Sequence, residues 1–291
     1  MSFIKGILYL SAVIINTVFW VPILLLFSVI KLLIPVVTIQ NVLSRFLIWI
    51  ADNWIGLNTN THRALHGNKI EVSGLQDLNM RDWYLVISNH CSAADIPILQ
   101  SILKNKIPFL KFFLKKELIY IPLLGLAWWA LDFPFMRRFS ADYLAKNPQM
   151  KGKDLEVTKK ACEKFKDYPI SVINFVEGTR FTSIKHKKQH SKYKNLLKPK
   201  SGGVGFVLGS MGEQMTYLIL VSIKYSPKAP NAWEYMTGKY DKVVVKVNKV
   251  KIPQELKGKN YITDLAFRKK LQVWLNGLWL EQDKRLNETL T

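Results

Sequence analysis

The 291-residue sequence contains only two cysteines, Cys91 and Cys162, which is too few for a disulfide framework. Acidic residues are also scarce, because 21 Asp and Glu stand against 42 Lys and Arg and leave a formal net charge of +21. Few cysteines and many lysines are typical of a domain on the cytoplasmic side, where thiols stay reduced. The positive charge predicts an anionic partner, and nucleic acid, anionic lipid headgroups, nucleotides and acidic carrier proteins all satisfy it.

Charge is almost absent from the first sixty residues. Four charged side chains occur there, with a net charge of +2 that leaves +19 for the remainder: Lys5, Lys31, Arg45 and Asp52. Residues 6–30 carry none, and a run of that length can cross about 30 Å of hydrocarbon. A cleaved signal peptide is the alternative, but it has a shorter apolar core and a small-residue cleavage site. Because Lys31 and Pro35 follow instead, the sequence favours an uncleaved membrane anchor.

A second helix is predicted from Val36 to Leu57, after the proline. Polar and apolar side chains fall on opposite faces at helical spacing: Asn41, Ser44, Arg45 and Asp52 on one, and Val42, Phe46, Trp49, Ile50 and Trp54 on the other. Such a helix either lies in the membrane interface or packs on the globular domain, and the pattern leaves both open. With a polar link at 58–68, we predict a membrane anchor and interfacial helix over 1–60 and one globular domain over 61–291.

After the link, short β-rich runs alternate with helical segments. Strands are predicted at Ile70–Val72, Trp83–Ser88, Ile170–Val176, Thr216–Tyr225 and Lys242–Asn248. Helices are predicted at Asp154–Lys166 and near the end of the chain, where Thr263 would cap a helix with an inner stripe of Phe267, Leu271 and Trp274. This alternation predicts an α/β fold, without internal repeats or low-complexity linkers.

The stretch Ile119–Met136 is unusually apolar for the middle of a globular domain. Prolines and a glycine interrupt it, so it is not expected to span a bilayer. It is either a buried core helix or a wall that meets lipid or a fatty chain. The second interpretation gains from Arg137 and Arg138, which would lie at the depth of the headgroups.

The segment Trp83–Ile96, WYLVISNHCSAADI, carries the first candidate chemistry. A β-branched apolar run stops at Ser88, and His90 follows, with Asp95 five residues later. Since Asp95 lies where a helix should begin, its carboxylate can fold back onto one ring nitrogen and leave the other as a proton acceptor. The alternative is that Asn89, Ser92 and Asp95 merely cap a helix.

The segment Phe175–Arg180, FVEGTR, also follows an apolar strand. Gly178 lets the backbone approach a ligand closely, and the Arg180 guanidinium can grip a phosphate with two hydrogen bonds. Glu177 could pair with Arg180 or order a basic neighbour. A bare turn after a strand would also use glycine, so this segment alone is only suggestive.

Together the two segments resemble the glycerolipid acyltransferases, the family of 1-acylglycerol-3-phosphate acyltransferases. The family pattern of Asn-His, four residues and Asp is matched by Asn89, His90 and Asp95, and its Phe-Pro-Glu-Gly-Thr-Arg pattern by Phe175, Glu177, Gly178, Thr179 and Arg180. Phe133–Arg137 resembles a further motif, an apolar run that closes on an arginine. The resemblance covers about residues 65–225. The residues after Arg180, with His186 and Leu197–Lys200, are most similar to a subgroup of bacterial inner-membrane acyltransferases and eukaryotic lysophospholipid acyltransferases.

The sequence departs from the family at several positions. Cys91 stands where a polar residue such as Gln is common, and Val176 replaces the usual proline. The last family motif is present only as Ile219–Ser222, which puts acceptor and acyl-chain preference in doubt. A Cys-His nucleophile at Cys91 is not needed for the chemistry. His186 and His190 have helical spacing for zinc but no carboxylate or cysteine beside them.

The resemblance implies an α/β fold with a mixed sheet flanked by helices. It also implies an O-acyltransferase that moves a fatty acyl group from a thioester to the hydroxyl of a lysophospholipid, most simply 1-acyl-sn-glycerol-3-phosphate. His90 would be the general base and Asp95 would orient it. Six residues would hold the substrate: Glu177, Gly178, Thr179, Arg180, Arg137 and Lys200. No metal or redox cofactor is implied, because acyl-CoA or acyl carrier protein enters as co-substrate. The chain would lie at a bacterial inner membrane with its catalytic domain cytoplasmic, and no nucleic acid is expected.

Two alternatives stay open. Another acceptor, such as glycerol-3-phosphate or a lysophosphatidylglycerol-type lipid, would keep the same chemistry. A membrane-tethered basic binding protein without catalysis would explain the anchor and the charge. It would leave the two strand-end motifs without a purpose.

Overall fold

A computed structural model describes residues 1–133, 135–136 and 168–288 of the chain. At its centre, the described strands form a mixed sheet in the order β1–β8–β7–β2–β6–β3. Four strands are parallel: β2 (Trp83–Ser88), β3 (Leu110–Phe112), β6 (Ser171–Phe175) and β7 (Met215–Ser226). β8 (Lys242–Lys251) is antiparallel to β7 and pairs with the edge strand β1 (Ile70–Ser73). The predicted α/β class with a mixed sheet is confirmed.

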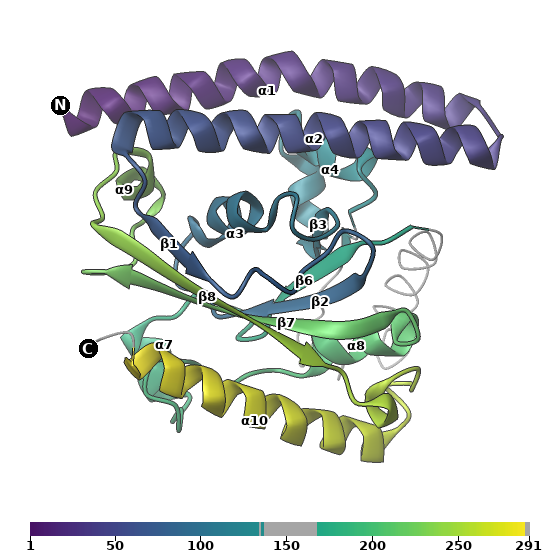
Figure 1. Cartoon of the computed structure of the whole chain (residues 1–291), viewed down its shortest axis with the longest axis vertical. Coiled ribbons are helices and arrows are strands. Elements are labelled where there is room, and N and C mark those ends of the chain that lie inside the picture. Colours follow the sequence, from purple (N-terminus) through teal and green to yellow (C-terminus); the bar gives the residue numbers. More distant parts are fainter. Residues whose placement is uncertain (134, 137–167, 289–291) are drawn as a thin grey trace.

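Helices cover both faces of the sheet (Figure 1). On one face lies a long antiparallel hairpin of α1 (Ser2–Leu33) and α2 (Val37–His66), with α3 (Asp95–Leu103) and α4 (Leu124–Ala130) beneath it. The short α9 (Ala232–Met236) supports the open end of this hairpin. On the other face lie α8 (Gly202–Met211) and α10 (Leu265–Glu288). A two-stranded sheet of β4 (Leu114–Lys115) and β5 (Phe135–Met136) and the 3-10 helices at Lys116–Tyr120 and Gln254–Leu256 complete the elements outside the site.

The two layers of helices produce two apolar cores, one on each side of the sheet. The strand β2 shows how alternation serves both, because successive side chains of a strand point to opposite faces. Tyr84 and Val86 pack toward the hairpin, whereas Leu85 and Ile87 pack toward α8 and α10. All four are fully buried, which fits the continuous apolar run of a strand in a parallel sheet.

The second helix is longer than predicted. It continues to His66 through the segment 58–68 that we expected to be a polar link. Its polar side chains have partners on neighbouring elements: Asn58 accepts a 2.7 Å hydrogen bond from Asn16 of α1, and the His62 ring contacts the Tyr235 carbonyl of α9 at 3.1 Å. These contacts satisfy polar groups that a sequence pattern alone assigns to solvent.

The glycine-rich segment that forms α8 was not predicted to be helical. Glycine lowers helix propensity, but here it allows close packing. A Cβ at Gly203 would lie 1.9 Å from the Asn174 amide, and one at Gly205 would lie 2.0 Å from the Tyr261 ring. At α10, Asp264 rather than Thr263 accepts the capping hydrogen bond, from the Phe267 N–H at 2.8 Å. The predicted helix at Asp154–Lys166 lies outside the described residues.

The apolar stretch Ile119–Met136 combines the two interpretations given to it. Within α4, Ala127 and Ala130 are buried against the hairpin side of the core, as a core helix requires. Leu126 and Trp129 on the same helix are exposed, as is Tyr120 just before it. One face of the segment therefore packs inward and the other leaves apolar side chains at the surface.

Candidate functional site

The strands β2, β6 and β7 run in parallel, so their carboxyl ends meet at one edge of the sheet. Ligands of open α/β sheets bind beyond this edge. The loop after β2 carries His90, and the turn after β6 carries Gly178 and Arg180. Phe181 N–H donates a 2.7 Å hydrogen bond to the His90 carbonyl, which joins the two segments directly. The sheet thus brings together motifs that are almost ninety residues apart.

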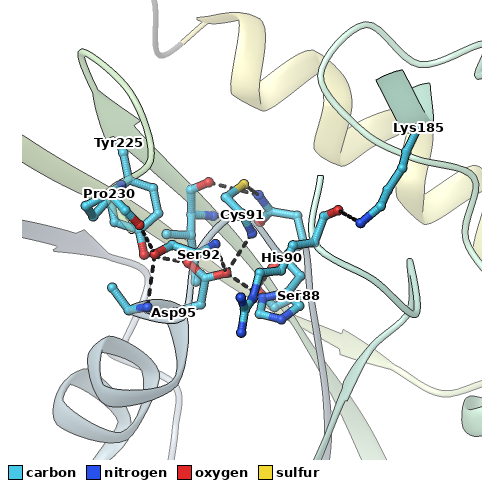
Figure 2. A network of polar contacts seen from close by, with 12 residues as sticks. Ser88, His90, Cys91, Ser92, Asp95, Lys185, Tyr225 and Pro230 are labelled. Carbon is cyan, nitrogen blue, oxygen red and sulfur yellow. Dashed lines mark hydrogen bonds and ion pairs between the residues drawn. The ribbon is translucent and has the colours of Figure 1, made fainter. Parts of the chain in front are cut away.

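The structure brings the His90 and Asp95 side chains together (Figure 2). His90 Nδ1 lies 2.7 Å from Asp95 Oδ2, and the imidazole stacks on Phe175 with 4.1 Å between ring centroids. Asp95 is the first residue of α3 and is fully buried, while His90 retains 14% side-chain exposure. Nε2 of His90 makes no hydrogen bond to the described residues. A carboxylate that holds Nδ1 fixes the tautomer in which Nε2 accepts a proton.

The Asp95 carboxylate has further donors on both of its oxygens (Figure 2). Oδ2 accepts from the backbone N–H groups of Cys91 at 2.7 Å and Ser92 at 3.0 Å, and Oδ1 accepts from the Tyr225 hydroxyl. The helix-cap interpretation of this loop is wrong, because the N-cap of α3 is Ala94 and no side chain makes a capping hydrogen bond there. The Asp95 carboxylate instead holds the loop that precedes the helix and contacts the histidine. Burial and the neighbouring Asp95 raise the pKa of Tyr225, so its hydroxyl keeps the proton that it donates.

Asn89 has a structural position rather than one in the site. Its amide oxygen accepts from the Ile223 N–H at 2.8 Å and its amide nitrogen donates to the Ile223 carbonyl at 2.9 Å. These two hydrogen bonds continue the ladder between β2 and β7 beyond the last strand residue. Its amide nitrogen also lies 3.2 Å from the Cys91 sulfur. Burial raises the pKa of the Cys91 thiol, and the carboxylates of Asp95 and Glu177 raise it further, which disfavours the thiolate.

The turn after β6 presents cations around a glycine. Gly178 has φ +71°, a region that glycine tolerates best, and the Lys200 side chain would lie 3.4 Å from a Cβ added there. Gly178, Arg180 and Lys200 are exposed, and Thr179 is half-buried. Lys185, on the short helix α7 (Ser183–Lys188), was not predicted as a site residue. Its Nζ donates to Thr179 Oγ1 at 2.7 Å and to the Arg180 carbonyl at 3.0 Å.

Glu177 lies inside the protein and not among the exposed groups. It is fully buried and accepts a 3.1 Å hydrogen bond from the Leu197 N–H. Burial raises the pKa of Glu177 to about 8, although the backbone groups of Leu197 and His90 act against this rise. This position does not allow the direct contact with a substrate phosphate that the sequence suggested, nor a pairing with the exposed Arg180. Glu177 instead fixes the segment that carries Lys200.

The remaining predicted residues divide into two groups. Arg137, together with Arg138, lies outside the described residues. The zinc alternative at His186 and His190 does not keep its geometry, because α7 ends at Lys188 and His190 has φ +46°. His186 Nε2 instead contacts the Tyr193 carbonyl at 2.6 Å.

Comparisons with known proteins agree with this geometry. A family model described as Acyltransferase matches residues 69–219, slightly more than half of the chain. A protein named 1-acyl-sn-glycerol-3-phosphate acyltransferase 3, from Arabidopsis thaliana, is 27% identical over 162 residues. This match covers 53% of the present chain and only 38% of the plant protein, so the chain spans about two fifths of that relative's length.

The fold is also found among solved structures. The crystal structure of the 1-acyl-sn-glycerophosphate (LPA) acyltransferase PlsC from Thermotoga maritima superimposes with a TM-score of 0.55. The superposition covers 99% of this chain and 98% of that one at 16% sequence identity, so it establishes a shared fold. From the family match over residues 69–219, which contains both strand-end motifs, the chain belongs to the Acyltransferase family.

Proposed function

We propose that this chain transfers a fatty acyl group from a thioester to the hydroxyl of a lysophospholipid, most simply 1-acyl-sn-glycerol-3-phosphate. The observation that carries the proposal is the 2.7 Å contact between His90 and the buried Asp95, beside an exposed turn of cations. Both relatives described above carry names that state an acyltransferase for this type of acceptor, which supports the same choice.

The proposed reaction uses His90 as general base. Its Nε2 takes the proton of the acceptor hydroxyl while the oxygen attacks the thioester carbonyl, and Asp95 stabilises the imidazolium that forms. When the tetrahedral intermediate collapses, the carbon–sulfur bond breaks. The imidazolium then returns the proton to the leaving sulfur. The products are an ester and a free thiol, so the balance requires no metal or redox cofactor.

The acceptor phosphate would lie against the turn at Gly178. Arg180 is exposed two residues after this glycine, and the exposed Lys200 side chain lies against it. A guanidinium can bind a phosphate with two parallel hydrogen bonds. Lys185 holds the turn in shape through Thr179 and the Arg180 carbonyl. Arg137 stays a prediction as an additional phosphate ligand.

The donor would approach over the basic segment that follows. Residues 178–200 contain no acidic side chain and eight cations: Arg180, Lys185, Lys187, Lys188, Lys192, Lys194, Lys198 and Lys200. Except for the half-buried Lys185, all of them are exposed. Acyl-CoA and acyl carrier protein are both anionic, so this surface fits either as the donor.

The hairpin would lie along the membrane rather than cross it. Among the described helices, α1 alone is long and apolar enough to span a bilayer. It packs along α2, however, with Phe27 on Phe46 and Trp20 on Trp49. A spanning α1 would have to separate from α2 or carry polar residues of α2 into hydrocarbon, at high cost. An in-plane hairpin leaves its outer apolar side chains in lipid and the lysine-rich domain over an anionic cytoplasmic leaflet.

The test is acyl transfer by purified His90→Ala protein in detergent, with a labelled thioester donor and a panel of lysophospholipids and glycerol-3-phosphate. We expect a loss of about 10³-fold in kcat, the scale of general-base catalysis. His66→Gln is the matched control, because it removes an imidazole that contacts the Met236 carbonyl, outside residues 178–200 and the contact with Asp95. Unchanged turnover in folded His90→Ala would disprove the mechanism. Absence of turnover in the wild type with every acceptor would disprove the function.

A further inference from the structure

We propose that Tyr225 is a positioning residue that, through Asp95, holds His90 in the orientation needed for acyl transfer. The inference rests on the proposed function of His90 and Asp95. Tyr225 is the last residue but one of β7 and lies 130 positions after Asp95 in the sequence. Neither strand-end motif includes it. Its hydroxyl meets the oxygen of Asp95 that does not contact the histidine.

The argument begins with the geometry of the carboxylate. Three donors from the loop after β2 converge on Oδ2: His90 Nδ1 and the backbone N–H groups of Cys91 and Ser92. Within the described residues, Oδ1 has only the Tyr225 hydroxyl. A carboxylate held at one oxygen can still rotate about its bond to Cβ, whereas one held at both oxygens cannot. Tyr225 therefore completes the restraint that keeps Oδ2 on His90.

The second step is the fixed position of Tyr225 itself. The Asn89 amide pairs with both backbone groups of Ile223, two residues before Tyr225, and so sets the register of β7 against the catalytic loop. Just beyond Tyr225, the Pro230 carbonyl accepts a hydrogen bond from the Ser92 hydroxyl. The segment from Ile223 to Pro230 is thus attached to the His90–Asp95 loop on both sides of the tyrosine. Tyr225 is also buried, so the ring has little freedom to move away.

The charged and titratable groups around this contact come from four elements. His90 and Cys91 belong to the loop after β2, and Glu177 lies in the turn after β6. Tyr225 is on β7, and Tyr235 of α9 lies close enough to affect it. Removal of the Tyr225 hydroxyl would leave more of the Asp95 charge directed at His90. The imidazolium would then be stabilised, and the base form would appear only at higher pH.

The experiment compares Tyr225→Phe with Tyr84→Phe. Tyr84 is a matched control in the same sheet, because it is buried and its hydroxyl also donates to a carboxylate, that of Asp82, at 3.0 Å. This contact lies at the opposite end of β2. For Tyr225→Phe we expect kcat to fall about tenfold, the effect of one lost hydrogen bond to a charged group, with KM almost unchanged. The acid limb of kcat/KM against pH should also move to higher pH, whereas Tyr84→Phe should leave both quantities at wild-type values.

The outcomes separate the two proposals. If the wild type is active and His90→Ala is not, but Tyr225→Phe matches Tyr84→Phe in kcat and in the acid limb, the positioning role is wrong and the proposed function stands. If kcat falls with an unmoved acid limb and in step with a lower melting temperature, Tyr225 is only a packing residue. If His90→Ala is as active as the wild type, the proposed function fails first, whatever Tyr225→Phe does.

Discussion

Glu177 belongs to the segment FVEGTR after β6, but its side chain lies in a buried setting. Its carboxyl group is fully buried and the pKa is raised to about 8, so the neutral acid predominates at pH 7. In the unfolded chain the same group titrates near its ordinary value of 4.5. Between pH 4.5 and 8 the folded state therefore holds a proton that the unfolded state releases. The stability that this proton contributes is complete below pH 4.5 and is lost as the pH rises through 8.

Glu177→Gln should remove this dependence, because the amide stays neutral and still accepts from the Leu197 N–H. The free energy of unfolding of the wild type should fall, relative to the variant, by about 1.4 kcal/mol per pH unit between pH 5 and 7.5. Chemical denaturation in detergent at several pH values measures the difference, and other titrating groups cancel in the comparison. Parallel stability curves for the two proteins would show that Glu177 is charged in the fold.

Cys91 is placed next to the histidine but is not set up as a nucleophile. Its pKa is raised by burial and by the carboxylates of Asp95 and Glu177, and its sulfur lies against the Asn89 amide. We expect Cys91→Ser to retain most of the transfer activity. Intact-mass measurement of wild-type protein with donor alone should find no acylated species. An acyl adduct that disappears in Cys91→Ser would contradict the direct transfer proposed above.

The contacts around His90 differ in how well the sequence alone could predict them. The contact between His90 and Asp95 follows from a strand, a short loop and a helix start, all within fifteen residues. Tyr225 and Lys185 were missed because their partners depend on tertiary structure. A signal for Tyr225 does exist, since it ends an apolar strand with a polar group. It becomes informative only once β7 is known to lie beside β2.

Among the elements, the strands were predicted best and the ends of helices least well. The strand β2 has the predicted bounds, because both of its faces are buried and its apolar run is continuous. The helix α2 exceeds its prediction by nine residues, since Asn58 and His62 have partners on α1 and α9. The helix α8 was not predicted, and its glycines allow close contact with Asn174 and Tyr261. For α2 and α8, a tertiary contact outweighed local propensity.

Over the chain as a whole, the apolar and the basic surfaces lie on opposite sides of the sheet edge that carries the candidate site. The hairpin exposes a row of large apolar side chains on α1: Phe3, Ile4, Ile7, Leu8, Ile14, Ile15, Val18, Phe19, Leu26, Val29, Leu32 and Leu33. The basic segment 178–200 lies beyond the carboxyl end of β6. An acceptor with its acyl chain in lipid and its phosphate at Arg180 would span the distance between these two surfaces. Under the proposed function, this separation would account for an apolar hairpin and a cationic turn in one chain.

This arrangement predicts which apolar residues bind membranes. Ile15 and Phe19 on α1 are 69% and 59% exposed, and their replacement by Asp should weaken binding to phosphatidylethanolamine–phosphatidylglycerol vesicles at least tenfold, since two apolar contacts are lost to charged groups. The control is Val273→Asp with Leu280→Asp, two exposed apolar residues of α10. This helix lies on the face of the sheet opposite the hairpin (Figure 1). Co-sedimentation measures both, and equal loss in the two double variants would contradict docking through the hairpin.

A second readout separates an in-plane hairpin from a spanning α1. With protein reconstituted on the outside of sealed vesicles, a protease site added before Ser2 should be cleaved as readily as one added after the C-terminus, because both ends of an in-plane hairpin protein stay on one side. The addition of detergent should then increase cleavage at neither of the two sites. If α1 crosses the bilayer without α2, the N-terminal site is protected until detergent is added. The hairpin would in that case have to open in the membrane, and its contacts between Asn16 and Asn58 and between Trp20 and Trp49 would be lost.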